Sequence, residues 1–194
     1  MGYLPGDLIS TDGADAVRFF ERSPGEGPTF AGHTAGIACK GWVNEALTTI
    51  TNTPWDLWLS KHPDFEIHRL VGLTIQQRIA LGKTAKQGTG NLYAPLKLGA
   101  HLTDWAIAWV RWGLTFGQWE GEARVARRLL PALGIKGFEI CSMHWAMVYD
   151  NTLHYREWGD PLMVNPDDMH DFIVASPRWK MVAKRENGVF TVNA

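Results

Sequence analysis

Runs of apolar residues and two kinds of spacing divide the chain into strands and helices. Residues 31–38 are small or apolar around one histidine, a pattern typical of a buried strand. Residues 65–70 alternate between apolar and polar side chains, which predicts another strand. The run 42–50 follows a Lys40-Gly41 turn, so we expect it to pair back on the first strand as a hairpin. Shorter strands are expected at residues 6–9 and 188–192.

Helical spacing and helix-end signals mark the segments between these strands. Thr74 is expected to cap a helix that runs to Lys86, because the sequence 87–90 contains two glycines and interrupts the pattern. A helix is likewise expected to start at Cys141. Further helices are expected at residues 14–22, 54–59 and 102–130, and after Asn165.

The longest of these helical segments is unusually rich in tryptophan. Trp105, Trp109 and Trp112 fall at positions i, i+4 and i+7 and therefore share one helix face. Such a face either belongs to the core or forms a cleft wall or partner surface, because large exposed apolar patches are rare on monomers. Gly113 and Gly117 are expected to break or kink this helix.

Composition favours a single soluble domain. The chain has 194 residues, of which 45% are hydrophobic and 20% charged, and this fits one globular unit with a sizeable core. The net charge is −1, so composition gives no support for binding to nucleic acid or to an anionic membrane. The N-terminus lacks the features of a signal peptide, and no apolar stretch approaches a membrane span. We therefore expect a protein made in the cytoplasm, without stable membrane insertion.

Cys141 is the residue that points most directly to chemistry. It stands at a predicted helix start, between an apolar approach and an aromatic-rich run. A helix N-terminus carries a partial positive charge and free N–H groups, which favour a thiolate and can hold an oxyanion. The alternative is a buried structural cysteine, since free cysteine is among the most buried residue types. Cys39 and Cys141 are both interpreted as thiols.

His33 is the candidate general base. Glycine and alanine flank it in the predicted strand, which leaves space beside the ring for a thiol and a substrate carbonyl. A satisfied core histidine is the alternative, but catalytic cysteine and histidine residues that are distant in sequence commonly meet in the fold. Together, Cys141 and His33 indicate nucleophilic catalysis.

A polar residue on the second strand of the hairpin is expected to hold the His33 ring in one orientation. A three-residue loop that pairs Ile37 with Glu45 brings Glu45 to the face of His33, whereas a two-residue loop brings Asn44 there. The other histidines are interpreted as structural. The acidic residues after Asn165 are expected at a helix start, so neither a metal nor a cofactor is predicted.

The order of these residues resembles that of circularly permuted papain-like cysteine amidases and peptidases, the permuted NlpC-like, YiiX-like group. A histidine strand comes early, a polar residue follows on the next strand, and a cysteine comes late at a helix start. The matching stretches are Gly6-Asp7-Leu8-Ile9, His33-Thr34-Ala35-Gly36-Ile37, Asn44-Glu45-Ala46, His68-Arg69-Leu70, Tyr93, Ile140-Cys141-Ser142, Asn165-Pro166-Asp167-Asp168 and Ala175-Ser176-Pro177.

This resemblance implies one α+β domain over residues 1–194, a permuted papain-like fold in which a small antiparallel sheet or barrel packs against the cysteine helix. It also implies a role for each site residue. Cys141 would be the nucleophile, His33 the general base and then acid, and Glu45 the group that orients His33. Tyr93 or Asn44 would lie at the oxyanion and substrate site. The tryptophan-rich segment at about residues 100–130 departs from the family pattern as an insertion. We expect it to form one side of the cleft.

Two classes of function follow from the sequence. The first is a cysteine hydrolase that cleaves an amide bond through an acyl-enzyme, above all in cell-wall peptides (peptidoglycan). Hydrolysis of acyl or lipid amides or esters, or acyl transfer, is an alternative within that class. The second is a non-catalytic binding or assembly module, such as a phage tail-associated component that becomes part of the virion. In that case the face of Trp105, Trp109 and Trp112 would contact a protein partner or a second copy of the chain.

Overall fold

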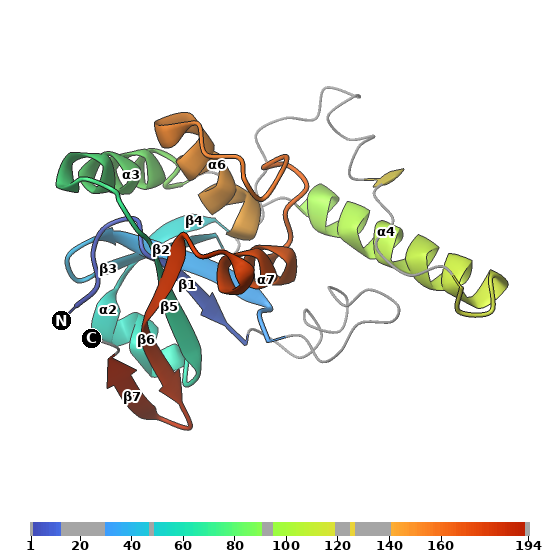
Figure 1. Ribbon diagram of the computed structural model, residues 1–194, viewed down its shortest axis with the longest axis horizontal. Coiled ribbons are helices and arrows are strands. Elements are labelled where there is room, and N and C mark those ends of the chain that lie inside the picture. Colours follow the sequence, from blue (N-terminus) through green and yellow to red (C-terminus); the bar gives the residue numbers. More distant parts are fainter. Residues whose placement is uncertain are drawn as a thin grey trace.

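An open antiparallel sheet forms the centre of the structure (Figure 1). The computed structural model describes residues 2–12, 30–46, 49–90, 95–118, 125–126 and 141–192. Seven strands in these residues follow the order β4-β3-β2-β1-β5-β6-β7, and all neighbouring pairs are antiparallel. They are β1 (Leu8–Thr11), β2 (His33–Cys39), β3 (Trp42–Ala46), β4 (Ile50–Pro54), β5 (Phe65–Leu70), β6 (Trp179–Glu186) and β7 (Val189–Val192).

The described residues also form five helices, so the fold belongs to the α+β class. They are α2 (Trp55–Lys61), α3 (Ile75–Gln87), α4 (Pro95–Leu114), α6 (Cys141–Leu153) and α7 (Pro166–Ala175). Helices α3 and α6 pack on β2 and on each other, α7 packs on α6 and β6, and α2 contacts β3 and β4. Figure 1 shows α4 extending away from the sheet, and α4 makes at most marginal contact with the other described elements.

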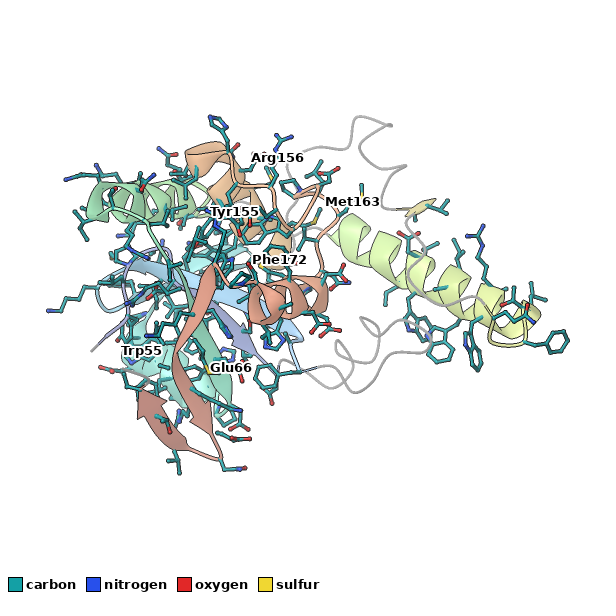
Figure 2. All side chains as sticks on the ribbon, viewed as in Figure 1. Trp55, Glu66, Tyr155, Arg156, Met163 and Phe172 are labelled. Atoms are coloured by element: carbon teal, nitrogen blue, oxygen red, sulfur yellow. The ribbon has the colours of Figure 1, made fainter. Side chains whose placement is uncertain are left out.

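Alternation along the strands divides the core between the two faces of the sheet. Leu8 belongs to a buried cluster with residues of α3, α6 and α7, whereas its neighbour Ile9 packs with Trp58 of α2 on the opposite face. Figure 2 shows Tyr155 on the side of α6 and α7, and Trp55 on the side of α2. Helices α3, α6 and α7 therefore pack on one face of the sheet, and α2 packs on the other. The ends of the central strands lie between these two groups of helices.

Close approach of backbone and side chains fixes α6 on β2 and β3. A Cβ atom at Gly36 of β2 would lie 2.4 Å from the Trp145 ring, so only glycine leaves room for this indole. The Trp145 Nε1 donates to the Asn44 carbonyl oxygen at 3.1 Å, and the Tyr149 hydroxyl donates to the Gly6 carbonyl oxygen. These contacts place the first turn of α6, and with it Cys141, beside the first residues of β2.

A buried carboxylate ties the opening strand to two other elements. Asp7, which has no exposed surface, forms ion pairs with Arg69 of β5 at 2.6 Å and with Arg78 of α3 at 3.1 Å. A buried carboxylate without partners would strongly destabilise the fold, so the two arginines account for its presence. The start of β1 is thereby held against β5 and α3.

The structure confirms several sequence predictions and corrects others. Strand 65–70 is β5, and Thr74 caps α3 with a reciprocal bond to Gln77. The expected strand 42–50 is wrong in extent, because β3 ends at Ala46 and a separate strand, β4, begins at Ile50. Strand β6 was not predicted. Helix α4 ends at Leu114 instead of near residue 130, and the predicted break at Gly113 and Gly117 is confirmed there, with Gly117 at positive φ. The expected helix at 14–22 lies outside the described residues.

The expected barrel is also not found in the described residues. Strands β4 and β7 lie at opposite edges of the sheet and do not pair with each other. The antiparallel arrangement and the packing of the sheet against the cysteine helix agree with the expectation.

The contact between α3 and β2 leads to a first test. A Cβ atom at Gly82 would lie 1.9 Å from the Ala38 carbonyl oxygen, a backbone atom that cannot rotate away. We expect Gly82→Ala to lower the free energy of unfolding by about 1–3 kcal/mol in urea denaturation, although alanine is the better helix former. Gly99→Ala in α4 is the control, because its Cβ would meet nothing within 4 Å. The control should be neutral or stabilise by up to about 1 kcal/mol. Equal stability of Gly82→Ala and the wild type would contradict the close packing.

Candidate active site

Cys141 is the first residue of α6, and its side chain is buried with only 4% of the residue exposed. Ala46 and Ile50 form the apolar cluster against which it packs. The backbone N–H groups of Thr34 and Ser142 donate hydrogen bonds to the sulfur. A thiol in this position faces the positive end of the helix dipole and two N–H donors, and both favour the thiolate.

His33 is the first residue of β2 and forms a hydrogen bond with the Cys141 side chain. Its backbone pairs with Thr11 of β1, and the preceding Gly32 donates from its N–H to the Thr11 carbonyl oxygen at 3.0 Å. The imidazole is therefore carried by the end of a strand whose position is fixed on both sides. A histidine next to a thiol in this geometry can take and return a proton.

Glu45 of β3 fixes the other side of the His33 ring. The His33 Nε2 donates to the Glu45 Oε2 at 3.3 Å, which leaves Nδ1 available to the thiol. The Glu45 carboxylate also accepts from the Trp58 Nε1 at 3.0 Å and from the Thr53 hydroxyl at 2.9 Å. The three donors thus come from three different elements, His33 from β2, Thr53 from β4 and Trp58 from α2.

The register of the hairpin explains why Glu45 and not Asn44 reaches His33. Ala35 of β2 pairs with Glu45 of β3, and Ala35 lies two residues after His33 on the same strand. His33 and Glu45 therefore point to the same face of the sheet. Ile37 pairs with Val43, which differs from the expected pairing of Ile37 with Glu45. Cys39 pairs with Trp42, so the turn is the two-residue loop Lys40-Gly41, which alone would bring Asn44 to the face of His33. A bulge between Ile37 and Cys39 shifts the register by one further residue and brings Glu45 there instead.

Asn44 points to the opposite face, toward α6. Its side-chain oxygen accepts from the His144 Nε2 at 2.7 Å, and its amide nitrogen donates to the Asn52 side chain at 3.1 Å. The structure therefore gives the two candidate residues different surroundings. Glu45 contacts His33, and Asn44 joins β3 to the helix that carries the cysteine.

Opposing electrostatic effects act on the pair of Cys141 and His33. Burial lowers the pKa of His33, but the charge and hydrogen bond of Cys141, together with those of Glu45, outweigh burial and raise this pKa to about 10. Burial raises the pKa of Cys141, but the His33 charge and the three hydrogen bonds to the sulfur reverse the direction and lower it. Both shifts favour a thiolate beside an imidazolium over a neutral thiol beside a neutral ring.

Glu45 stays ionised in this environment. Burial raises its pKa, while the hydrogen bond and charge of His33 and the hydrogen bonds from Thr53 and Trp58 lower it, and the net direction is down. Its negative charge in turn favours the protonated form of His33. The three groups therefore stabilise one another's charged forms.

Sequence reasoning missed three residues around Glu45. Thr53 and Trp58 donate to its carboxylate, and His62, which was expected to be structural, has its Nε2 3.9 Å from the Glu45 Oε2. The His62 ring stacks on Trp58 with centroids 4.3 Å apart and lies parallel to the His33 ring at 6.1 Å. The spacing of Trp58 and His62, four residues apart at a helix end, was the available signal that they share a face.

The remaining predicted site residues are not brought to the thiol by any described contact. Tyr93 lies outside the described residues. Trp105, Trp109 and Trp112 lie along one face of α4, as predicted, with neighbouring ring centroids 6.1 and 5.6 Å apart. They interact with one another, and Trp112 is 37% exposed.

Comparison with known proteins gives a fold likeness. No protein-family model and no curated protein matches the chain. Among solved structures, the crystal structure of metalloprotein YiiX from Escherichia coli O157:H7 (DUF1105) is similar, with a TM-score of 0.57 and 18% sequence identity. The match covers 95% of this chain and 98% of that one. At this identity the likeness shows a shared fold, and it agrees at that level with the group that the motifs resemble.

YiiX is a metalloprotein, and a metal site in a protein requires several ligating side chains close together. They contain no group of three or more histidine, cysteine, aspartate or glutamate side chains that could hold a metal ion. A second carboxylate, Glu66, does accept from the His170 Nε2 at 3.2 Å and lies 3.6 Å from the His68 Nε2, but Lys184 also contacts it at 3.4 Å.

The pKa shifts determine how this site contributes to stability as pH changes. The pKa of His33 is about 10 in the folded state and 6.5 when unperturbed, so its contribution is complete below pH 6.5 and disappears as pH rises through about 10. The pKa of Cys141 is lowered from 9.0, so its contribution is complete above pH 9.0 and disappears as pH falls through the folded value. The two contributions therefore depend on pH in opposite directions, because the His33 contribution falls and the Cys141 contribution grows as pH rises.

The titration of His33 tests this charge coupling directly. In the wild type we expect the ring to stay protonated up to about pH 10 when followed by histidine-selective NMR. In Cys141→Ala the thiolate is lost while burial remains, so the pKa of His33 should fall. His68, whose pKa burial lowers to about 4, is an internal control that should titrate alike in both proteins. An unchanged His33 titration in Cys141→Ala would contradict the ion pair.

Proposed function

We propose that the protein is a cysteine hydrolase of the papain-like type that cleaves an amide bond through an acyl-enzyme. The observation that carries the proposal is the convergence of Cys141, His33 and Glu45 from a helix start and two neighbouring strands. Each of the three has contacts that favour its charged form. A purely structural cysteine in the core requires neither a paired imidazole nor a buried carboxylate behind it.

The arrangement supports a two-step reaction. The Cys141 thiolate attacks the carbonyl carbon, a C–S bond forms, and the oxygen becomes an oxyanion. The oxyanion collapses, the C–N bond breaks, and the leaving amine takes its proton from the His33 imidazolium. Water then attacks the thioester while His33 accepts its proton, the C–S bond breaks, and a carboxylic acid and the thiolate result.

Glu45 would serve as a positioning residue throughout this cycle. Its bond to the His33 Nε2 would hold the ring in one orientation and leave Nδ1 available to the sulfur, whether the ring is charged or neutral. The N–H groups at the start of α6 would stabilise the oxyanion, as a helix N-terminus can. Tyr93 is the further oxyanion contact that the family resemblance implies.

The substrate class is proposed from resemblance and chemistry together. The chain order of histidine strand, acidic residue and cysteine helix is that of permuted NlpC-like amidases, which favours amide bonds in cell-wall peptides. Acyl or lipid amides and esters, or transfer of an acyl group to an acceptor other than water, use the same nucleophile and base. The proposed catalytic pair is therefore common to all these substrates.

Alkylation measures the reactivity of the thiol without a known substrate. Near neutral pH we expect iodoacetamide to label Cys141 about tenfold faster than Cys39 or more, because the thiolate is the reactive form. Peptide mass spectrometry after timed quenching separates the two sites, and Cys39→Ser confirms the assignment. Equal and slow labelling of both cysteines would overturn the proposal and favour a non-catalytic module.

The role of Glu45 has a matched control within the same sheet. Glu45→Gln keeps the shape but removes the charge, so the thiolate–imidazolium pair is weakened and the alkylation rate of Cys141 should fall about tenfold. Glu66→Gln changes another buried glutamate that contacts histidines, His170 and His68, and should leave the rate within about twofold. If both variants lowered the rate equally, Glu45 would have no special connection with the thiol.

A further inference from the structure

The C-terminal end of α4 exposes large apolar side chains. Leu114 is 75% exposed and Phe116 is 94% exposed, and Val110 and Trp112 on the preceding turns are also exposed. Figure 1 shows α4 extending away from the sheet, with this end farthest from it. We call residues 110–117 the α4 tip. Exposed apolar side chains gathered in one place usually mark a binding surface.

The backbone of the α4 tip is well defined by hydrogen bonds. The Phe116 N–H donates to the Gly113 carbonyl oxygen at 3.2 Å, and the Gly117 N–H donates to the Trp112 carbonyl oxygen at 2.9 Å. This is the Schellman pattern, which satisfies the last carbonyl groups of a helix. The Thr115 side chain adds a bond to the Arg111 carbonyl oxygen at 2.9 Å. The tip is therefore a formed helix end and not a frayed one.

Phe116 occupies a position in this pattern that disfavours it. Its φ angle is +52°, in the left-handed region that glycine adopts without strain and bulky residues rarely adopt. The ring is almost wholly exposed, so packing within the described part of the chain does not compensate for the strain. A strained and exposed aromatic side chain is explained most simply by a contact that forms outside the free molecule.

The geometry around Phe116 directs the apolar side chains outward. The Trp112 indole lies over Gly117, where a Cβ would be 3.6 Å from the ring, and so fills the inner side of the turn. Leu114 and Phe116 are left projecting from the end of the helix. A narrow, projecting apolar tip differs from the broad surface of about 800 Å² per partner that a stable protein complex needs.

The charged side chain of the tip indicates which kind of apolar partner the tip fits. Between residues 105 and 118 the only charged side chain is Arg111, which is exposed and lies one turn before Leu114. Arginine and tryptophan beside projecting leucine and phenylalanine are the combination found where a protein meets the headgroup and acyl regions of a bilayer. No helix in the described residues is long and apolar enough to cross a membrane. Shallow contact is therefore the form of membrane binding that the tip fits.

We propose that the α4 tip docks the protein reversibly on a lipid bilayer, with Leu114 and Phe116 entering the acyl region and Arg111 contacting headgroup phosphates. This surface is separate from the Cys141 site and does not depend on catalysis.

Vesicle co-sedimentation tests the proposal with the full chain. The probes are large unilamellar vesicles of phosphatidylcholine alone and of phosphatidylcholine with phosphatidylglycerol at about 3:1. We expect the wild type to pellet with both, and somewhat more with the anionic mixture because of Arg111. Phe116→Gly and Leu114→Ser should each lower the partition coefficient roughly tenfold, since each removes a large apolar side chain from the acyl region.

The Phe116→Gly variant separates loss of binding from loss of folding. Glycine prefers the left-handed position, so this variant should unfold at the same temperature as the wild type or a higher one. Val174→Ser, at a residue of α7 that is 60% exposed, is the matched control and should bind vesicles as the wild type does. Cys141→Ala should also bind normally, so a failure of the catalytic proposal would not affect this result.

Two outcomes would overturn the docking proposal. One is a wild type that stays in the supernatant with both vesicle types. The other is vesicle binding that Phe116→Gly and Leu114→Ser do not reduce. If the wild type ignored vesicles but formed a dimer that Phe116→Gly dissociated in analytical ultracentrifugation, the tip would be a protein contact.

Discussion

The buried carboxylate of Glu45 is the interaction on which the candidate site depends. An ionised carboxylate in the core destabilises the fold unless donors surround it, and here His33, Trp58 and Thr53 supply them. Those donors come from β2, α2 and β4, so the strand order and the position of α2 are both required. Orientation of the His33 ring is then a consequence of satisfying the buried charge. The hydrogen bond that orients the His33 ring is thus one of those that stabilise the folded sheet.

Sequence patterns predicted the elements that have strong local signals. The alternation of residues 65–70 and the capping threonine of α3 are local, and both were found where expected. Strand β6 was missed because basic residues and exposed positions interrupt its apolar pattern, and its pairing with β5 and β7 is what makes it a strand. Strand β4 was missed for a similar reason, because it is polar and half-exposed, and only its hydrogen bonds to β3 define it as a strand.

The candidate site could be predicted only in part, and the division has a physical cause. Small residues around His33 and the helix start at Cys141 are visible in the sequence because they concern immediate neighbours. The choice of Glu45 over Asn44 depended on a bulge between Ile37 and Cys39, which shifts the register by one residue and so changes which side chain shares the face of His33. Trp58 and Thr53 could not be found in this way, because their contact with Glu45 exists only once α2 and β4 have packed.

A comparison within the molecule shows what distinguishes the Cys141 site from a structural histidine cluster. The pairs His33–Glu45 and His68–Glu66 have similar separations between ring nitrogen and carboxylate oxygen, 3.3 and 3.6 Å, and all four residues are buried. Beside Glu66, burial lowers the pKa of His68 to about 4, so that ring stays neutral. Beside Glu45, the additional charge of a thiolate reverses the effect of burial and the pKa of His33 rises to about 10. A histidine–carboxylate contact therefore does not by itself create an imidazolium in this core, whereas the same contact with Cys141 at the start of α6 does.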